Sequence, residues 1–442
     1  MASKWRTKKA DLKTNLAKRR PDIAELSIPT HFRCPISLDL MKDPVTVATG
    51  ITYDRQSIET WLDMENMTCP VTNQELNVED LIPNHSIRKM IQDWCVANHS
   101  YGIERIPTPK IPVTAAQASE ILSGIATASR KGETTKCREL VVKVKAFAKE
   151  SERNRRCFMS KGACRALAAS FSAFASGPSE NSTAGVLEDI LSALAFMLPL
   201  DEEAAWHIGS PESLNSMVSI LKGGDLAGRL SAVLVVKELV SANREWVEVM
   251  AKTEGLIEAM VQLIKEPIFP QATKASLVAT FYMVNSDERT ASRFVDLGLV
   301  PVLLDILVDT EKSMCEKALA VLSGLLSCEE GREKAYEHAL TMPVLVKKMF
   351  RVSDMATEFV VSALWKLCKN YKEEEEEGER RGGCLVEALQ VGAFQKLLLL
   401  LQVGCGGSTK EKATDLLKLL NGYTSRAECI DTMDFRGLKR PS

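Results

Sequence analysis

The cysteine and histidine side chains of residues 28–101 are the groups most capable of chemistry, either as zinc ligands or as thiol nucleophiles. A small zinc-braced domain draws its ligands from closely spaced pairs, usually Cys-x-x-Cys. This stretch has no such pair and no His and Cys at metal-ligand spacing. We therefore expect no structural metal and no cofactor here. The six candidate ligands are His31, Cys34, Cys69, His85, Cys95 and His99.

Two of these thiols, Cys34 and Cys69, could also form a thioester as nucleophiles. Neither has an obvious activating base or a sequence setting that would lower the pKa of its thiol. We therefore expect both to be buried structural thiols.

The elements that must position these side chains are a β-hairpin and two helices. Val45 and Val47 alternate with polar residues before the turn glycine Gly50, which is typical of a hairpin. Asp54 then precedes a helical pattern, and we expect its side chain to cap that helix. A second helix is predicted to start near Asn84. The apolar faces of the two helices are Ile58, Trp61 and Leu62, and Ile87, Ile91, Trp94 and Cys95.

A domain this small needs a substitute for zinc. A structural zinc supplies about 10–16 kcal/mol in small modules, and a hydrogen bond to a charged group about 1.5–3 kcal/mol. We therefore expect several such bonds beside an apolar core. The polar groups available are Asp39, Lys42, Asp43, Asp54, Arg55, Glu59 and Asn84.

A series of short motifs gives this stretch a specific resemblance. They are Cys34-Pro35-Ile36, Leu40-Met41, Asp43-Pro44-Val45, Thr52-Tyr53-Asp54-Arg55, Ile58, Trp61-Leu62, Cys69-Pro70 and Leu81-Ile82-Pro83-Asn84. In order and spacing they resemble the U-box, the zinc-free relative of RING domains in ubiquitin ligases. The resemblance implies structural roles for Cys34, Asp43, Pro44, Tyr53, Asp54, Arg55 and Asn84.

The resemblance also implies a partner. The domain would dock a ubiquitin-conjugating enzyme charged with ubiquitin and orient the thioester for attack by a substrate lysine, with no covalent intermediate of its own. The family's docking surface maps onto Ile36, Leu38, Trp61 and Pro70, and exposed apolar anchors suit a transient interface. Trp61 also lies on an apolar helix face, so a core role stays open.

One position departs from the family pattern. Many U-box and RING ligases carry an Arg shortly after the second-loop Pro, where it contacts both ubiquitin and the conjugating enzyme. Here Asn73 occupies that neighbourhood. The expectation is docking with weaker activation of the thioester.

The rest of the chain is repetitive helix. Successive anchors at Gly162, Gly209, Gly255, Gly298, Leu340 and Gly392 are separated by 47, 46, 43, 42 and 52 residues. This is close to the armadillo and HEAT period of about 40–47 residues. The long step holds an acidic, Gly-rich stretch that we expect to be a loop insertion.

These phrases resemble armadillo repeats, and plant ubiquitin ligases commonly join a U-box to such repeats in this order. Nuclear-import receptors of the same repeat class carry Trp and Asn at regular positions. Here Trp206, Trp246 and Trp365 are irregularly placed, which disfavours that function.

Five segments are predicted: a basic flexible leader (residues 1–26), a U-box headpiece (27–101), a Pro-rich linker (102–113), an armadillo rod (114–423) and a polar tail (424–442). The net charge of −2 gives no support for nucleic-acid binding. No apolar run approaches the roughly 20 residues of a membrane span. Because no signal peptide is evident, we expect reduced cysteines and a cytoplasmic location, and the basic leader leaves the nucleus open.

The predicted fold class is mostly α: a small zinc-free RING-like α+β U-box followed by an α-helical armadillo-repeat solenoid. The resemblance to the plant U-box/armadillo-repeat ubiquitin-protein ligase family implies a ligase whose armadillo groove binds the protein substrate. It further links the chain to regulated protein turnover in stress or defence signalling. A non-enzymatic scaffold whose headpiece only docks or forms a homodimer stays open. Hydrolase and nucleotide-driven functions have no supporting motif.

Overall fold

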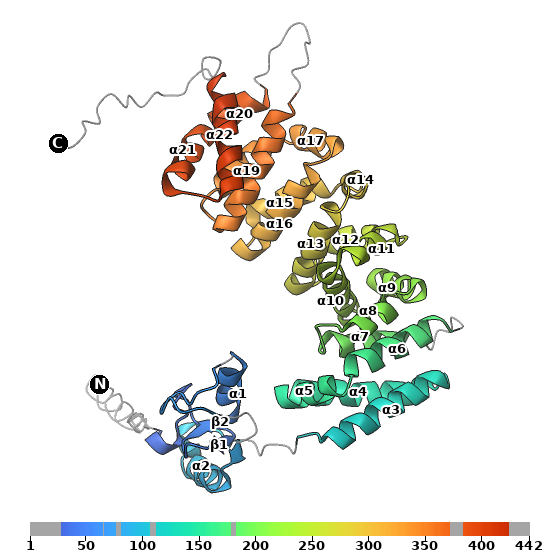
Figure 1. Cartoon of the computed structure of the whole chain (residues 1–442), viewed down its shortest axis with the longest axis vertical. Coiled ribbons are helices and arrows are strands. Elements are labelled where there is room, and N and C mark those ends of the chain that lie inside the picture. Colours follow the sequence, from blue (N-terminus) through green and yellow to red (C-terminus); the bar gives the residue numbers. More distant parts are fainter. Residues whose placement is uncertain are drawn as a thin grey trace, which may run out of the picture. The chain divides into compact units, whose positions relative to one another are not determined.

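The computed structural model describes residues 28–64, 66–76, 81–106, 112–177, 183–371 and 383–423. It divides into two compact units, Met1–Ile111 and Pro112–Ser442, which are described separately (Figure 1). The predictions for the basic leader, the acidic insertion and the polar tail lie outside the described residues, as does part of the Pro-rich linker. The segment boundaries stay predictions.

A three-stranded antiparallel sheet organises the headpiece. The middle strand β1 (Pro44–Thr46) pairs with β2 (Thr52–Asp54) on one side and β3 (Ile82–Pro83) on the other. The predicted hairpin is confirmed, with Gly50 at φ +82° in its turn. The third strand was not predicted, because a two-residue strand that contains proline has no alternating pattern.

Two α-helices and two 3-10 turns complete the headpiece. The helices are α1 (Arg55–Asp63) and α2 (His85–Ala97), and the turns are η1 (Thr30–Phe32) and η3 (His99–Tyr101). Their apolar faces pack on the core as predicted, with Trp61, Ile87 and Trp94 only partly buried. The buried core consists of Phe32, Cys34, Met41, Val45, Val47, Tyr53, Ile58, Leu62, Cys69, Leu76, Ile91, Cys95 and Ile106.

The rod starts with α3 (Ala115–Arg130) and α4 (Thr134–Glu150). Six helix triplets follow in its described part, each with a first helix of seven to nine residues and a third of 13 to 17. The triplets are α5 (Glu152–Ser160), α6 (Ala163–Ala175), α7 (Thr183–Ala195); α8 (Glu202–Ile208), α9 (Pro211–Gly223), α10 (Leu226–Ala242); α11 (Arg244–Lys252), α12 (Leu256–Lys265), α13 (Pro270–Val284); α14 (Glu288–Asp296), α15 (Leu299–Asp309), α16 (Lys312–Leu325); α17 (Glu329–Tyr336), α18 (Thr341–Lys348), α19 (Asp354–Lys369); and α20 (Cys384–Gln390), α21 (Ala393–Val403), α22 (Gly407–Asn421).

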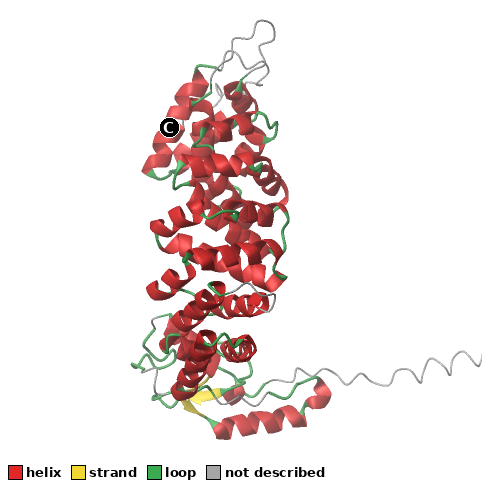
Figure 2. Cartoon of the chain, turned by 90° about the vertical axis from the view of Figure 1, so that its right-hand side faces the viewer, coloured by secondary structure: helices red, strands yellow, loops and turns green. Residues whose placement is uncertain are grey.

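The third helices form the continuous spine of the rod. From α4 onward, α7, α10, α13, α16, α19 and α22 each pack on the third helix before them, and Figure 2 shows the resulting layers. One apolar core runs through all of them. Each triplet therefore buries its apolar face mainly against its neighbours, as in an armadillo solenoid.

All six predicted anchors lie in the turn between the first and second helices of a triplet. Four of them, including Gly162 and Gly298, have positive φ, which glycine adopts without a steric penalty. Gly209 has φ −77°, and a Cβ there would overlap the indole ring of Trp246. Glycine therefore recurs at the anchors because the turn has a positive φ in four triplets and because a Cβ has no room in one.

No single helix among the described residues is long and apolar enough to cross a membrane. The pair α20 and α21, bent by 70°, reaches the required length and composition only together. Leu385, Leu389 and Leu397 of this pair are buried in the core of the rod.

Candidate partner-docking site on the headpiece

Two loops of the headpiece share one backbone geometry. In the first loop (residues 34–39) the amide of Leu38 donates to the Cys34 carbonyl at 2.8 Å, and the Cys34 amide donates to the Asp39 carbonyl at 2.9 Å. In the second loop (residues 69–74) the amide of Asn73 donates to the Cys69 carbonyl at 2.8 Å, and the Cys69 amide donates to the Gln74 carbonyl at 2.8 Å. Each loop is thus closed by its own backbone around a buried cysteine.

The fifth residue of each loop has a left-handed backbone conformation. Leu38 has φ +62° and Asn73 has φ +57°. Asn adopts this region more readily than most residues, so the backbone conformation explains why Asn is suited to position 73. The sequence alone did not reveal this. For Leu38 the conformation costs on the order of 1–3 kcal/mol. Leu38 is nevertheless 69% exposed, so the strained position presents a large apolar side chain to solvent.

Helix α1 supports the second loop through Trp61. The indole Nε1 of Trp61 donates to the Thr68 carbonyl at 2.8 Å, and its ring packs against the headpiece core. Ile36 and Pro70 are, like Trp61, only partly buried. The four predicted docking residues therefore lie on α1 or on the two loops, and all keep some exposed surface. Their docking role stays a prediction.

The Cys69 sulfur is surrounded by hydroxyl groups. The Thr49 hydroxyl donates to it at 3.3 Å, and the Tyr53 hydroxyl lies 3.1 Å away. Burial raises the pKa of the Cys69 thiol, but hydrogen bonds from Thr49, Thr72 and Tyr53 outweigh burial and lower the pKa to about 6. Burial, together with the same contact with Cys69, raises the pKa of Tyr53.

The thiol of Cys34, in the first loop, also lies among hydrogen-bond donors, some of which come from the start of α1. Burial raises the pKa of its thiol, while backbone amides, led by those of Ser37 and Asp54, outweigh burial and lower it. The expectation that neither thiol has a setting that lowers its pKa is therefore wrong. The expectation of burial is right, because neither Cys34 nor Cys69 exposes any surface.

A partly buried ion triad braces the headpiece. Asp43 accepts from Arg55 Nε at 2.6 Å through one carboxylate oxygen and from Arg88 Nη2 at 2.6 Å through the other. Charge-assisted bonds of this length are stronger than neutral ones. The triad joins the segment before β1 to both helices. Arg88 was missed by sequence reasoning, although it lies one turn after the predicted helix start at Asn84.

Asp54 does not cap α1, contrary to expectation. Its Oδ1 accepts instead from the backbone amides of Lys42 at 2.7 Å and Asp43 at 2.9 Å. These amides belong to a loop whose donors need an acceptor. The carboxylate thus fixes the Asp43 backbone, and with it the ion triad.

Asn84 joins α2 to the sheet. Its Oδ1 accepts from the Ile87 amide at 3.0 Å, which caps the helix, and its Nδ2 donates to the hydroxyls of Thr46 and Thr52. Its backbone amide donates to the carbonyl of the buried Pro44 at 2.8 Å. One side chain thus ties the second helix to β1 and β2.

No group of three or more His, Cys, Asp or Glu side chains in the described part of the chain could hold a metal ion. Loops that are closed by their own backbone and carry exposed apolar residues can bind another protein.

Comparisons with known proteins match both units. The family model for the U-box domain matches residues 28–100, and the model for the plant U-box protein ARM repeat region matches residues 117–439. U-box domain-containing protein 21 of Arabidopsis thaliana is 41% identical, with 99% of each chain covered. U-box domain-containing protein 20 of the same plant is 42% identical over 94% of this chain and 93% of the relative. The E3 ubiquitin-protein ligase PUB23, also from Arabidopsis thaliana, is 35% identical over 92% and 96%. This chain therefore belongs to the family of plant U-box proteins with an armadillo-repeat region.

Proposed function

We propose that this protein is a ubiquitin-protein ligase that activates its partner without covalent catalysis. The headpiece docks a ubiquitin-charged conjugating enzyme and promotes transfer of ubiquitin to a substrate lysine. The family membership and the relative named as an E3 ubiquitin-protein ligase support the general activity. The observation that carries the docking step is Leu38, a strained and exposed apolar residue at the tip of a loop closed by its own backbone.

Burial of the thiols supports a non-covalent mechanism. A ligase that carries ubiquitin on its own cysteine needs a thiol that the incoming thioester can reach. Cys34 and Cys69 have a lowered pKa but no exposed surface. The headpiece would therefore act by holding the charged enzyme in a reactive orientation. The ion triad around Asp43 keeps the two helices and the loops in place for this role.

The rod would bind the protein substrate, as the armadillo resemblance implies. An apolar anchor for a partner is available at Trp206, which is 64% exposed and packs edge-to-face on Trp246 at 5.4 Å between ring centroids. The two rings border a cavity of about 260 Å³ that Glu238 and Glu245 also line. Exposed tryptophans beside a pocket are frequent anchors of protein interfaces.

The proposal is tested by reconstituted ubiquitination with activating enzyme, ATP, ubiquitin and a panel of conjugating enzymes. We expect ubiquitin chains with the native protein and a strong loss for Leu38→Ala. Val96→Ala on α2, which also removes an exposed aliphatic side chain, is the matched control and should keep activity. Equal activity of the two variants would refute docking through Leu38.

The scaffold alternative gives a different result. If the headpiece only docks or dimerises, the native protein forms no chains with any conjugating enzyme but still binds partners through the rod. Sedimentation of the full chain would then measure self-association. We place the protein in the cytoplasm, and imaging of a fluorescent fusion with and without residues 1–26 tests whether the basic leader directs it to the nucleus.

A further inference from the structure

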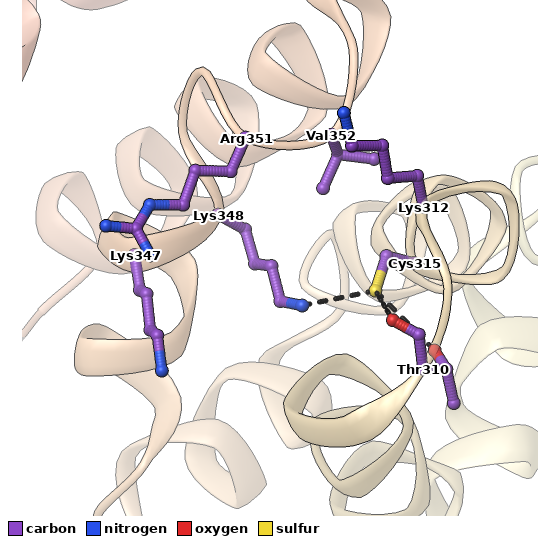
Figure 3. A pocket seen from close by; sticks show the side chains of 7 residues that line it. All are labelled: Thr310, Lys312, Cys315, Lys347, Lys348, Arg351 and Val352. Carbon is purple, nitrogen blue, oxygen red and sulfur yellow. Dashed lines mark hydrogen bonds between the residues drawn. The ribbon is translucent and has the colours of Figure 1, made fainter.

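A small cavity in the rod collects four positive charges. It has a volume of about 90 Å³ and lies where α16, the turn before it, the end of α18 and the turn after α18 meet. Figure 3 shows side chains from both helices around this space, with Lys348 reaching across toward Cys315. No carboxylate lines the cavity. The side chains that matter are Thr310, Lys312, Cys315, Lys347, Lys348 and Arg351.

The position of Lys348 differs from that of an ordinary helix-end lysine. Lysines in the last turn of a helix usually complement its dipole. Here the Lys348 ammonium instead reaches α16 and donates to the Cys315 sulfur at 3.3 Å, while that thiol donates to the Thr310 carbonyl at 3.4 Å. Sulfur is a weak acceptor. Lys348 therefore retains hydrogen-bonding capacity at the cavity.

Lys312 adds charge at an unfavourable place. It is the first residue of α16, at the positive end of the helix dipole, and no side chain caps this helix. Like charges that line one cavity repel one another. Such an arrangement becomes favourable when an anion occupies the space between the charges.

Two carboxylates on or next to α16 are engaged elsewhere. Glu311 pairs with Lys274 at 2.5 Å, and Glu316 accepts from the Ser353 hydroxyl at 2.5 Å. Within the described part of the chain, none of the four cations of the cavity forms an ion pair. Among the described residues, no carboxylate therefore forms an ion pair with the positively charged side chains of this cavity.

The charge and size of the cavity favour a phosphoryl group. A phosphorylated side chain carries close to two negative charges and three strong acceptor oxygens at neutral pH. A single carboxylate would neutralise only one of the four cations. By volume the cavity holds several waters, at about 10–15 Å³ each, so it accommodates one compact anion. Lys and Arg are the side chains that bind phosphate most strongly.

We propose that this cavity binds the phosphoryl group of a phosphorylated serine or threonine side chain on a protein held by the rod. The inference rests on the proposed function in that the bound protein would be the ubiquitination substrate. Lys348 at the end of α18, Arg351 in the turn after it and Lys312 at the start of α16 contact the phosphoryl oxygens in the bound state. Phosphorylation of the substrate would then strengthen its binding to the ligase.

The test uses the full chain and calorimetric titration with blocked phosphoserine, blocked serine and inorganic phosphate as probes. We expect phosphoserine to bind, serine not to bind, and the affinity for phosphoserine to fall with rising salt. The double variant Lys348→Gln/Arg351→Gln should weaken phosphoserine binding by at least about tenfold. Lys143→Gln/Lys145→Gln on α4 removes the same charge far along the chain and should bind as the native protein does.

Three results would overturn the proposal. They are no binding of phosphoserine, equal binding by the two double variants, or binding of inorganic phosphate with exclusion of phosphoserine. Because calorimetry requires no ubiquitin transfer, these outcomes are independent of ligase activity. The Lys348→Gln/Arg351→Gln protein should still discharge ubiquitin from a charged conjugating enzyme to free lysine, since that step depends on the headpiece.

Discussion

Replacing Asp43 by Ala should lower the stability of the headpiece and leave that of the rod unchanged. The carboxylate pairs with Arg55 and Arg88, and the three side chains keep only 14–21% of their surface exposed. Removing one partner of a buried ion pair costs about 3–5 kcal/mol. Because some solvent reaches this triad, we expect a loss near the lower end, about 3 kcal/mol.

Hydrogen exchange of the full chain, followed by mass spectrometry, measures this loss region by region. A change of about 3 kcal/mol corresponds to roughly 100-fold faster exchange in peptides from α1 and α2 that exchange through headpiece opening. Peptides from the rod should not change, because the rod has its own core. Asp39→Ala is the matched control, since Asp39 is exposed and forms no ion pair among the described residues. Equal exchange in the two variants would show that the triad does not brace the headpiece.

Three further outcomes follow from single side chains. Folding lowers the pKa of Cys69 from 9.0 to about 6. Between these pH values the unfolded headpiece binds more protons than the folded one, so the free energy of unfolding should rise from pH 6 to pH 9. Hydrogen exchange corrected for intrinsic rates should show this rise, and Cys69→Ala should abolish it; an unchanged slope would contradict a thiolate. Asn73→Arg should speed ubiquitin discharge if missing charge limits activation, and an unchanged rate would exclude that role. Gly209→Ala should destabilise the rod by about 1–3 kcal/mol through overlap with Trp246, whereas Gly223→Ala, with open space around it, should leave the melting temperature nearly unchanged.

Local patterns were sufficient to predict the main elements. Val45 and Val47 before Gly50 indicated the hairpin, and the spacing of Ile58 and Leu62 indicated the buried face of α1, because these signals depend on neighbours in sequence. The repeat anchors likewise recur at the same turn of each triplet, since each triplet meets the same packing problem.

The site depended on contacts that local patterns do not report. Arg88 reaches Asp43 across 45 residues, and Thr49 reaches the Cys69 sulfur across 20. Asp54 was interpreted as a helix cap because its neighbours fit that motif, yet loop amides 11 and 12 residues earlier compete for its carboxylate. Such choices between a local and a distant donor are settled only in the folded headpiece.

The headpiece, as proposed above, activates a ubiquitin-charged conjugating enzyme without carrying ubiquitin itself. A single-turnover assay that follows discharge of ubiquitin from the charged enzyme to free lysine tests this directly. We predict faster discharge with the native protein, a near-background rate with Leu38→Ala, and no ubiquitin adduct on the protein that reducing agent removes. An adduct that disappears on reduction and requires Cys34 or Cys69, or no acceleration with any conjugating enzyme of a broad panel, would contradict it.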